Sequence, residues 1–592
     1  MNINRPAIGI RPIIDARRLG IRDALEDKCA EMAKAAKELI EKECFYADGT
    51  PARVVVYSGG SIACGEEAAR CDAEFASQDV IATLSVTPSW CYPLETIDIN
   101  PAFIKAIWGF NGTERPGAVY LAAALSACDQ MGVPTFSIYG RETQDITDHT
   151  IPADVAEKIV RFAQASIAVG QMKGRSYVSV GGVSMGIMGS FLDPSFFMKY
   201  LGMRPEWLDM TEILRRMKLH IYCDEEYQEV LGWIKENCPE GWDKNRKDLI
   251  HSPEQKVLDW EFVAKLTVIL KDVMQGNDKL QELGWDEEAF GKNALFAGFQ
   301  GQREWSDWNP NCDFTESIFN STFDWRGKKM PTVLATENDS LNGTAMLFAN
   351  LLTGTAPGFA DVRCYWDPKA VERVSGWKPE GTAANGFIHL INSGACCLDA
   401  CGESVDATGA HVMKRWWEMN EEDIRACLKA ADWCPASLTE FRGGGFSSHF
   451  MTAHEMPITM LRVNLVDGVG PTLQIAEGTS CVLPDEVHKV IDARTDPTWP
   501  TTYFVPNTTG HGAFRDVYSV MDNWGANHGA FCYGHIGADL ITLASMLRIP
   551  VTMHNVAEEN LFRPHAWSAF ATSDPEQADA RACAHYGPRY RQ

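Results

Sequence analysis

The sequence predicts an α/β protein: two N-terminal α/β domains, each with a parallel, helix-flanked sheet, followed by a β-rich C-terminal domain. Strand-like and helical stretches alternate in the first half of the chain, which is typical of parallel sheets. With 592 residues the chain is too long for one compact core. After about residue 355 it becomes rich in Gly and Trp, with short β-rich runs.

The first domain is predicted over residues 1–172. Apolar residues between positions 21 and 43 recur every three or four residues, as on one face of an amphipathic helix. Further short runs are expected to be strands, and two longer apolar stretches are expected to be helices. The strands are residues 53–57, 80–86 and 134–138, and the helices are residues 117–131 and 154–171.

The second domain is predicted over residues 173–355 and the third over residues 356–592. The second begins with a strand at 177–180 and a glycine-rich turn at 181–186, and its polar stretch at 222–257 is expected to form exposed helices. It ends with a strand that runs into acidic residues at 337–339, followed by a helix at 341–352. The third domain has strand candidates at 358–363, 387–391, 460–465 and 472–475.

Composition excludes several classes of function. The chain has 54 Lys and Arg against 79 Asp and Glu, a formal net charge of -25, so nucleic acid is not an expected partner. It has no apolar run of roughly 18 residues and no apolar signal segment at its start, so we expect no membrane association. The 18 cysteines form no CxxC pair and indicate reduced thiols in a cytoplasmic protein. Cys396, Cys397 and Cys401 lack the second ligand pair of a thiolate metal site.

Two carboxylates lie where a parallel sheet places its ligand site. Glu337 ends one predicted strand, and Asp361 lies in the next, about one helical crossover later. The carboxyl ends of such strands face the crevice where open α/β sheets bind ligands, so the two side chains could converge. For Glu337 a helix cap or a solvated side chain is an equal alternative. Asp361 lies in an apolar strand and is expected to be buried or paired, whereas Asp339 is expected to cap the helix.

A third candidate is His528, in a glycine-rich segment that resembles no regular element. It is one of 14 histidines, and His535 and His554 compete with it. If Glu337, Asp361 and His528 met, their oxygens and imidazole would suit a hard or borderline divalent cation, manganese better than zinc. Such an ion polarises a carbonyl while carboxylates move a proton.

Several longer strings identify a family. They are IGIRP (8–12), FNGTERPG (110–117), GVSMG (182–186), AGFQGQR (297–303), ATENDSLNG (335–343) and WGANHG (524–529). Together they resemble the L-fucose isomerase family from near the first residue to about position 588.

The resemblance implies a three-domain subunit assembled as a homohexamer, with active sites near subunit boundaries. It implies an aldose–ketose isomerase that converts L-fucose to L-fuculose, and D-arabinose to D-ribulose, with Mn²⁺ as cofactor. Glu337, Asp361 and His528 match the family's metal ligands, and Glu337 and Asp361 also match its acid/base pair. Residues that match the sugar pocket are Arg18, Trp90, Met185, Gln300, Ser393 and Asn527, with Arg18, rather than Arg17, able to reach a neighbouring subunit's site.

One position departs from the family pattern. Glu440 precedes the string FRGGG (441–445), where a Tyr is expected, and this bears on substrate preference. A sugar-binding protein without turnover and a metal-dependent aldolase, or an isomerase of another sugar, are the competing interpretations. The intact acid/base pair disfavours a binder, and the absence of a phosphate-binding glycine loop favours an unphosphorylated substrate.

Overall fold

The computed structural model describes residues 3–570 and 574–590, and in these ranges its first sheet is fully parallel. The strand order is β2-β1-β3-β4-β5. The strands are β1 (Ala7–Pro12), β2 (Arg53–Val56), β3 (Val80–Thr87), β4 (Ile104–Gly109) and β5 (Thr135–Ile138). The accompanying helices are α1 (Asp23–Glu43), α2 (Gly65–Ser77), α3 (Pro93–Thr96), α4 (Ala118–Met131) and α5 (Ala153–Met172). The predicted strands and helices are confirmed here, and β1 and β4 join them.

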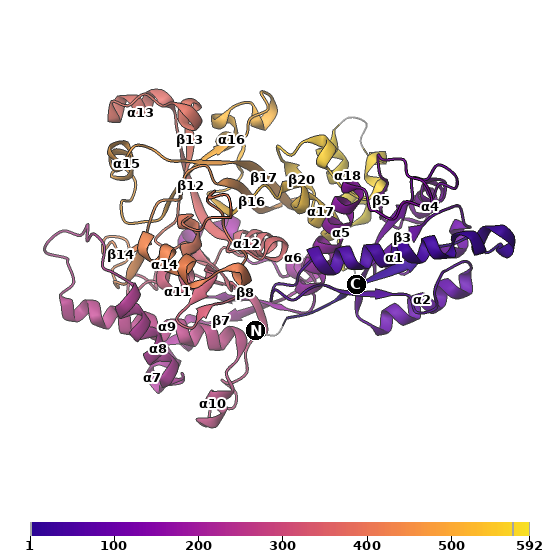
Figure 1. Ribbon diagram of the computed structural model, residues 1–592. Coiled ribbons are helices and arrows are strands. Elements are labelled where there is room, and N and C mark those ends of the chain that lie inside the picture. Colours follow the sequence, from indigo (N-terminus) through magenta and orange to yellow (C-terminus); the bar gives the residue numbers. More distant parts are fainter. Residues whose placement is uncertain (1–2, 571–573, 591–592) are drawn as a thin grey trace.

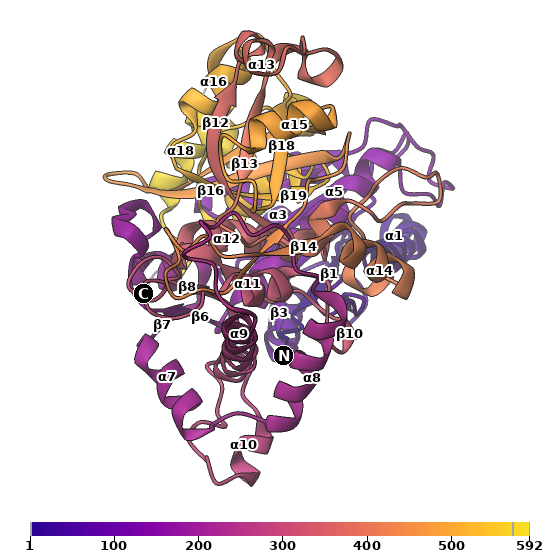
Figure 2. The ribbon, with the colours of Figure 1, turned by 90° about the vertical axis from the view of Figure 1, so that its left-hand side faces the viewer.

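The second sheet is also parallel, with the order β11-β8-β6-β7. Its strands are β6 (Ser176–Val180), β7 (Arg204–Leu208), β8 (Ala294–Phe299) and β11 (Val333–Ala335). The helices of this region are α6 (Pro194–Phe196), α7 (Met210–Leu219), α8 (Asp224–Asn237), α9 (Pro253–Gln275), α10 (Asp278–Glu282), α11 (Asp313–Asn320) and α12 (Ser340–Thr353). The polar stretch predicted as exposed helices corresponds to α8 and the start of α9, and α7 to α10 form one tip of the molecule in Figure 2.

The C-terminal region is built on a mainly antiparallel sheet in the order β16-β19-β12-β13-β18-β17-β20. A further pairing of β16 with β17 closes it into a barrel. The strands are β12 (Gly358–Trp366), β13 (Phe387–Ile391), β16 (Pro457–Val466), β17 (Gly470–Cys481), β18 (Thr501–Pro506), β19 (His528–Tyr533) and β20 (Val551–Met553). Outside the barrel, β14 (Asp432–Pro435) and β15 (Phe446–His449) form a hairpin. The α/β class with a β-rich C-terminal region is therefore confirmed.

Helix α12 joins the second sheet to the barrel. It contacts β8 and β11 on one side and β12, β16 and β19 on the other, so nearly all of its side chains are buried. Figure 2 shows it between the barrel strands and the second sheet. A helix that is buried all round needs apolar residues on every face, and the sequence LNGTAMLFANLL provides them. Residues 337–339, between β11 and α12, therefore lie at the boundary between the second sheet and the barrel.

The end of the chain returns to the first sheet. Helix α17 (Gly537–Leu547) packs on α5, and Phe136 of β5 forms a bridge with Pro564. In Figure 1 these segments lie side by side with α18 (Pro575–Tyr586), on the opposite side of the molecule from the remaining helices α13 (Pro368–Ser375), α14 (Glu421–Ala430), α15 (Asp485–Asp492) and α16 (Val517–Asn523). All 18 cysteines fall in the described ranges and are free, as the sequence indicates. No described helix is both long and apolar enough to cross a membrane.

Candidate metal centre and active site

Glu337 lies in a single helical turn between β11 and α12, and its backbone is left-handed, with φ +57°. Asn338 is left-handed as well, and its side chain holds the turn: its amide nitrogen donates to the Ser179 hydroxyl and its oxygen accepts from the Tyr177 hydroxyl. A side chain at Gly298 would meet the Asn338 oxygen at 2.6 Å, so this close approach requires glycine. Left-handed conformations of other residues cluster at functional sites.

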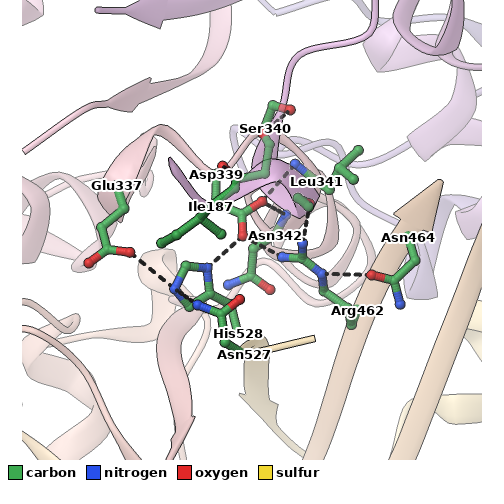
Figure 3. Close-up of polar contacts among 12 residues, drawn as sticks. Ile187, Glu337, Asp339, Ser340, Leu341, Asn342, Arg462, Asn464, Asn527 and His528 are labelled. Carbon is green, nitrogen blue, oxygen red and sulfur yellow. Dashed lines mark hydrogen bonds and ion pairs between the residues drawn. The ribbon is translucent and has the colours of Figure 1, made fainter. Parts of the chain in front are cut away.

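Asp361 and His528 are direct neighbours across the antiparallel pair β12–β19. His528 Nε2 lies 3.4 Å from an Asp361 carboxylate oxygen and 3.2 Å from a Glu337 carboxylate oxygen. The structure thus brings together the three residues that the sequence singled out, and Figure 3 shows Glu337 facing the His528 ring. Glu337 is buried and does not cap α12, which settles the alternatives for that residue. The expectation that His528 lies in an irregular loop is wrong: it is the first residue of β19.

The His528 ring is fixed by its surroundings. It is fully buried, and it packs on Phe359 with ring centroids 4.8 Å apart. The Trp524 indole nitrogen donates to the His528 carbonyl oxygen at 3.1 Å, which anchors the start of β19. Neighbouring Asn527 places its amide nitrogen 2.9 Å from Nε2. A ring so enclosed presents Nε2 in one direction only.

Asp339 is the helix cap that the sequence predicts, and it has a further role that the sequence did not reveal. Its Oδ1 accepts from the backbone N–H groups of Leu341 and Asn342. Its Oδ2 lies 2.6 Å from His528 Nδ1 and 2.5 Å from an Arg462 guanidinium nitrogen. Arg462 was missed altogether, although a lone Arg inside the apolar run ITMLRVNLV is a signal for a buried ion pair.

Burial and charge act against each other at this site. Burial alone would lower the pKa of His528, but hydrogen bonds to Asp339 and Glu337 raise it. Burial raises the pKa of Asp361, and the nearby Glu337 charge adds to that shift. For Asp339, burial is outweighed by Arg462 and His528, which hold its pKa well below the usual range. Asp339 is therefore a carboxylate and can only accept hydrogen bonds.

The donor set fits a divalent cation. Two carboxylates crowd one imidazole nitrogen, and a cation between them would relieve their mutual repulsion. Oxygen and imidazole donors suit manganese or a similar ion. A separate group of described side chains, Asp432, Cys434 and His449, has ligand atoms that all lie within 4.8 Å of one another.

The Asp432 group lies on the β14–β15 hairpin, away from the predicted ligands in sequence. Its members already pair among themselves: His449 Nδ1 lies 2.9 Å from an Asp432 oxygen, and the Cys434 sulfur lies 3.8 Å from the same oxygen. Ordinary hydrogen bonds explain this cluster without a cation.

The predicted sugar-binding residues divide into two groups. Asn527, Ser393, Met185 and Gln300 lie on segments that adjoin those of the predicted metal ligands. Ser393 follows β13 just beyond Ile391, which pairs with Asp361. Gln300 follows β8, and its oxygen accepts from the backbone N–H of Gly182 at 2.7 Å. Met185 is left-handed and half exposed, in the segment that Asn338 contacts through Gly182.

Arg18 and Trp90 are not brought to this site. They follow strands of the first sheet, which occupies the other side of Figure 1. Trp90 is 37% exposed, and the Arg18 side chain is 63% exposed. Arg17 pairs with Asp15 at 2.6 Å although its side chain is 56% exposed, and Arg18 lies 3.9 Å from both Asp23 and Glu26. Glu440 lies exposed in a turn beside buried Phe441.

Three models of one protein family together match most of the chain. Family models described as the first N-terminal, second N-terminal and C-terminal domains of L-fucose isomerase match residues 5–174, 175–354 and 390–554. The chain belongs to the L-fucose isomerase family. The L-fucose isomerase of Clostridium perfringens is 56% identical over 99% of both chains. Those of Phocaeicola vulgatus and Streptococcus pneumoniae are also 56% identical, over 99% and 100% of both chains.

Membership in the L-fucose isomerase family covers the residues that form the candidate centre. Glu337 lies within the match to the second N-terminal domain, and His528 lies within the match to the C-terminal domain. Asp361 lies in the stretch between those two matches, at the start of the barrel. The centre is thus built where two of the family's domains meet.

Proposed function

We propose that this protein is an Mn²⁺-dependent aldose–ketose isomerase that converts L-fucose to L-fuculose and also D-arabinose to D-ribulose. The observation that carries the proposal is the convergence of Glu337, Asp361 and His528 in a chain of this family. L-fucose isomerase is also the name of the relatives that match nearly the whole chain. The two aldoses share their stereochemistry at C2 to C4, so a site that reads those hydroxyls accepts both.

In this proposal the two carboxylates divide the proton transfers. Glu337 removes the proton from C2 of the open-chain aldose, while Asp361, whose pKa burial raises, donates a proton to O1. The resulting cis-enediol then receives a proton at C1 and loses one from the C2 hydroxyl, which yields the ketose. Bound Mn²⁺ would polarise the carbonyl and favour loss of the C2 proton. Glu337, Asp361 and His528 Nε2 are the groups that would hold it.

The surrounding residues would orient the sugar. Gln300, Ser393 and Asn527 offer amide and hydroxyl groups to sugar hydroxyls, and the half-exposed Met185 offers an apolar contact. Because a small apolar group contributes about 1–3 kcal/mol, the C5 methyl of L-fucose should alter affinity more than chemistry. Glu440 is exposed, where the family pattern has a Tyr, so it could modify this preference.

A homohexamer belongs to the same proposal. Arg18 and Trp90 match sugar-pocket positions yet are exposed on the first sheet, so they would complete the site of a neighbouring subunit. Free cysteines favour a cytoplasmic location. Sedimentation velocity of the purified protein would test the assembly.

The activity test uses the full chain loaded with Mn²⁺. Ketose formation from L-fucose and D-arabinose is measured alongside a panel of other aldoses and ketose phosphates. Turnover of both sugars is the expected result. No turnover of either sugar with metal confirmed bound would contradict the proposal, and sugar binding without turnover would favour a binding protein instead.

A further inference from the structure

We infer that Asp339, anchored by Arg462, is a positioning residue that holds the His528 imidazole with Nε2 facing Glu337 and Asp361. The inference rests on the proposed function, because it assigns to His528 a metal ligand's task. It adds two residues to the site, one from the start of α12 and one from the middle of β16.

The two oxygens of Asp339 do different things. Oδ1 caps α12 through the N–H groups of Leu341 and Asn342, while Oδ2 faces His528 Nδ1 at 2.6 Å. A carboxylate cannot donate, so Nδ1 must carry the hydrogen. In the neutral form, which is the form that binds a cation, His528 then has its lone pair on Nε2, on the side of Glu337 and Asp361. Figure 3 shows the ring held between Asp339 on one side and Glu337 on the other.

Arg462 fixes the position of that carboxylate. Its guanidinium donates to Asp339 Oδ2 at 2.5 Å, to the Gly189 carbonyl oxygen at 2.7 Å and to the Asn464 side-chain oxygen at 3.2 Å. Arg462 and Asp339 are both fully buried. Three anchors in different elements leave the guanidinium, and therefore Oδ2, little freedom to move.

A helix cap alone does not explain this arrangement. Asp367 caps α13 with one oxygen bonded to the Ala370 N–H, and it is neither fully buried nor paired with a buried arginine in the described contacts. Burying an Asp–Arg pair costs desolvation energy that capping does not require. Carboxylates that bond the second nitrogen of a metal-ligating histidine fix its tautomer and orientation. The geometry of Asp339 fits that task.

The test separates capping from positioning. Asp339→Asn keeps an oxygen for the cap, since Asn is an equally good cap residue, but presents an N–H₂ group to His528 Nδ1. That favours the tautomer with hydrogen on Nε2, which cannot bind a cation. Because Asp339→Asn leaves Arg462 buried without its partner, the double variant Asp339→Asn with Arg462→Met is made as well. Asp367→Asn is the matched cap control.

Wild type, the two Asp339 variants and the Asp367→Asn control are stripped of metal as full-length proteins and titrated with Mn²⁺ by calorimetry. Electron paramagnetic resonance then reports the surroundings of the bound ion. Melting temperatures measured without metal show whether each variant is folded. Both Asp339 variants should bind Mn²⁺ about 10- to 100-fold more weakly with an altered resonance spectrum, and the control should bind as wild type does. Folded Asp339 variants with wild-type affinity would overturn the inference and leave the proposed function standing.

Two further outcomes are decisive. If the single and double variants both fail to fold while Asp367→Asn folds, the Asp339–Arg462 pair is purely structural, and the inference is wrong. If the wild-type protein itself binds no Mn²⁺, the proposed function fails, and the inference fails with it.

Discussion

The two parallel sheets of this chain both carry predicted site residues at their carboxyl edges, but only one of the two edges is buried. Both place predicted site residues after the carboxyl ends of their strands: Arg18 and Trp90 on the first sheet, and Glu337 on the second. On the first sheet these side chains are exposed. On the second, the barrel covers the edge and adds Asp361 and His528.

The difference shows what turns a sheet edge into a site. The carboxyl edge of a parallel sheet gathers polar groups in any α/β protein. It becomes a buried centre here because α12 packs between the sheet and the barrel, which brings β12 and β19 against the turn that carries Glu337. On the first sheet Arg18 and Trp90 stay exposed, and under the proposed function they would contact another subunit.

The largest expected effect comes from substitutions at the covered edge, the carboxyl edge of the second sheet that the barrel covers. Under the proposed function, Glu337→Gln and Asp361→Asn should each reduce kcat for L-fucose by about 10³-fold or more, since each would remove a proton-transferring group that would also be a metal ligand. Steady-state assays at saturating Mn²⁺ measure this, with metal content determined in parallel. Retention of more than a tenth of the wild-type kcat by either variant would contradict its assigned role.

Substitutions at the exposed carboxyl edge of the first sheet should have a smaller effect, on KM rather than on kcat. Arg18→Ala and Trp90→Ala should raise KM for L-fucose roughly tenfold while leaving Mn²⁺ affinity unchanged, because these side chains would contact only the sugar. Arg17→Ala is the matched control, since Arg17 is held by Asp15. An unchanged KM for both variants would show that Arg18 and Trp90 do not contact the sugar.

A third effect, on stability rather than on catalysis, concerns the exclusion of water from the covered edge. Glu316 of α11 is buried and accepts a hydrogen bond from the Thr336 hydroxyl at 2.7 Å, next to Glu337. Burial raises the pKa of Glu316 to about 8, well above its ordinary value of 4.5. Between those pH values the unfolded chain loses this proton and the native protein keeps it, so the wild type loses stability by about 1.4 kcal/mol per pH unit at most.

Glu316→Gln removes that titration and should keep the hydrogen-bond acceptor. The melting temperature of the variant relative to wild type should therefore rise between pH 5 and pH 8. Glu114→Gln, an exposed change at the edge of the first sheet, controls for the loss of one negative charge. A difference between Glu316→Gln and wild type that is the same at both pH values would show that the covered edge is hydrated.

Much of the fold and part of the site could be predicted from sequence, because both depend on local pattern. The periodicity of apolar residues and the local composition predicted the ends of α1, β3 and α5 to within one or two residues. Glu337 and Asp361 were predicted as site residues because the carboxyl ends of parallel strands face the ligand crevice. Asp339 was predicted as a helix cap because it lies directly before a helix.

The remaining parts of the site depend on contacts between distant segments. His528 was selected from 14 histidines by family resemblance, since its value comes from the β12–β19 register, which no local pattern contains. The link from Asp339 to Arg462 was invisible for the same reason. The resemblance supplied Arg18 and Trp90, and their place in an assembly stays a prediction.

The register of β12 against β19 also bears on how the protein is made. Asp339 precedes His528 by 189 residues, so a growing chain exposes its acidic turn long before the histidine strand leaves the ribosome. A slip of one residue between β12 and β19 would turn Asp361 and His528 to opposite faces of the sheet. Under the proposed function, a bound cation would stabilise only the correctly paired chains, because only they bring Glu337, Asp361 and His528 together.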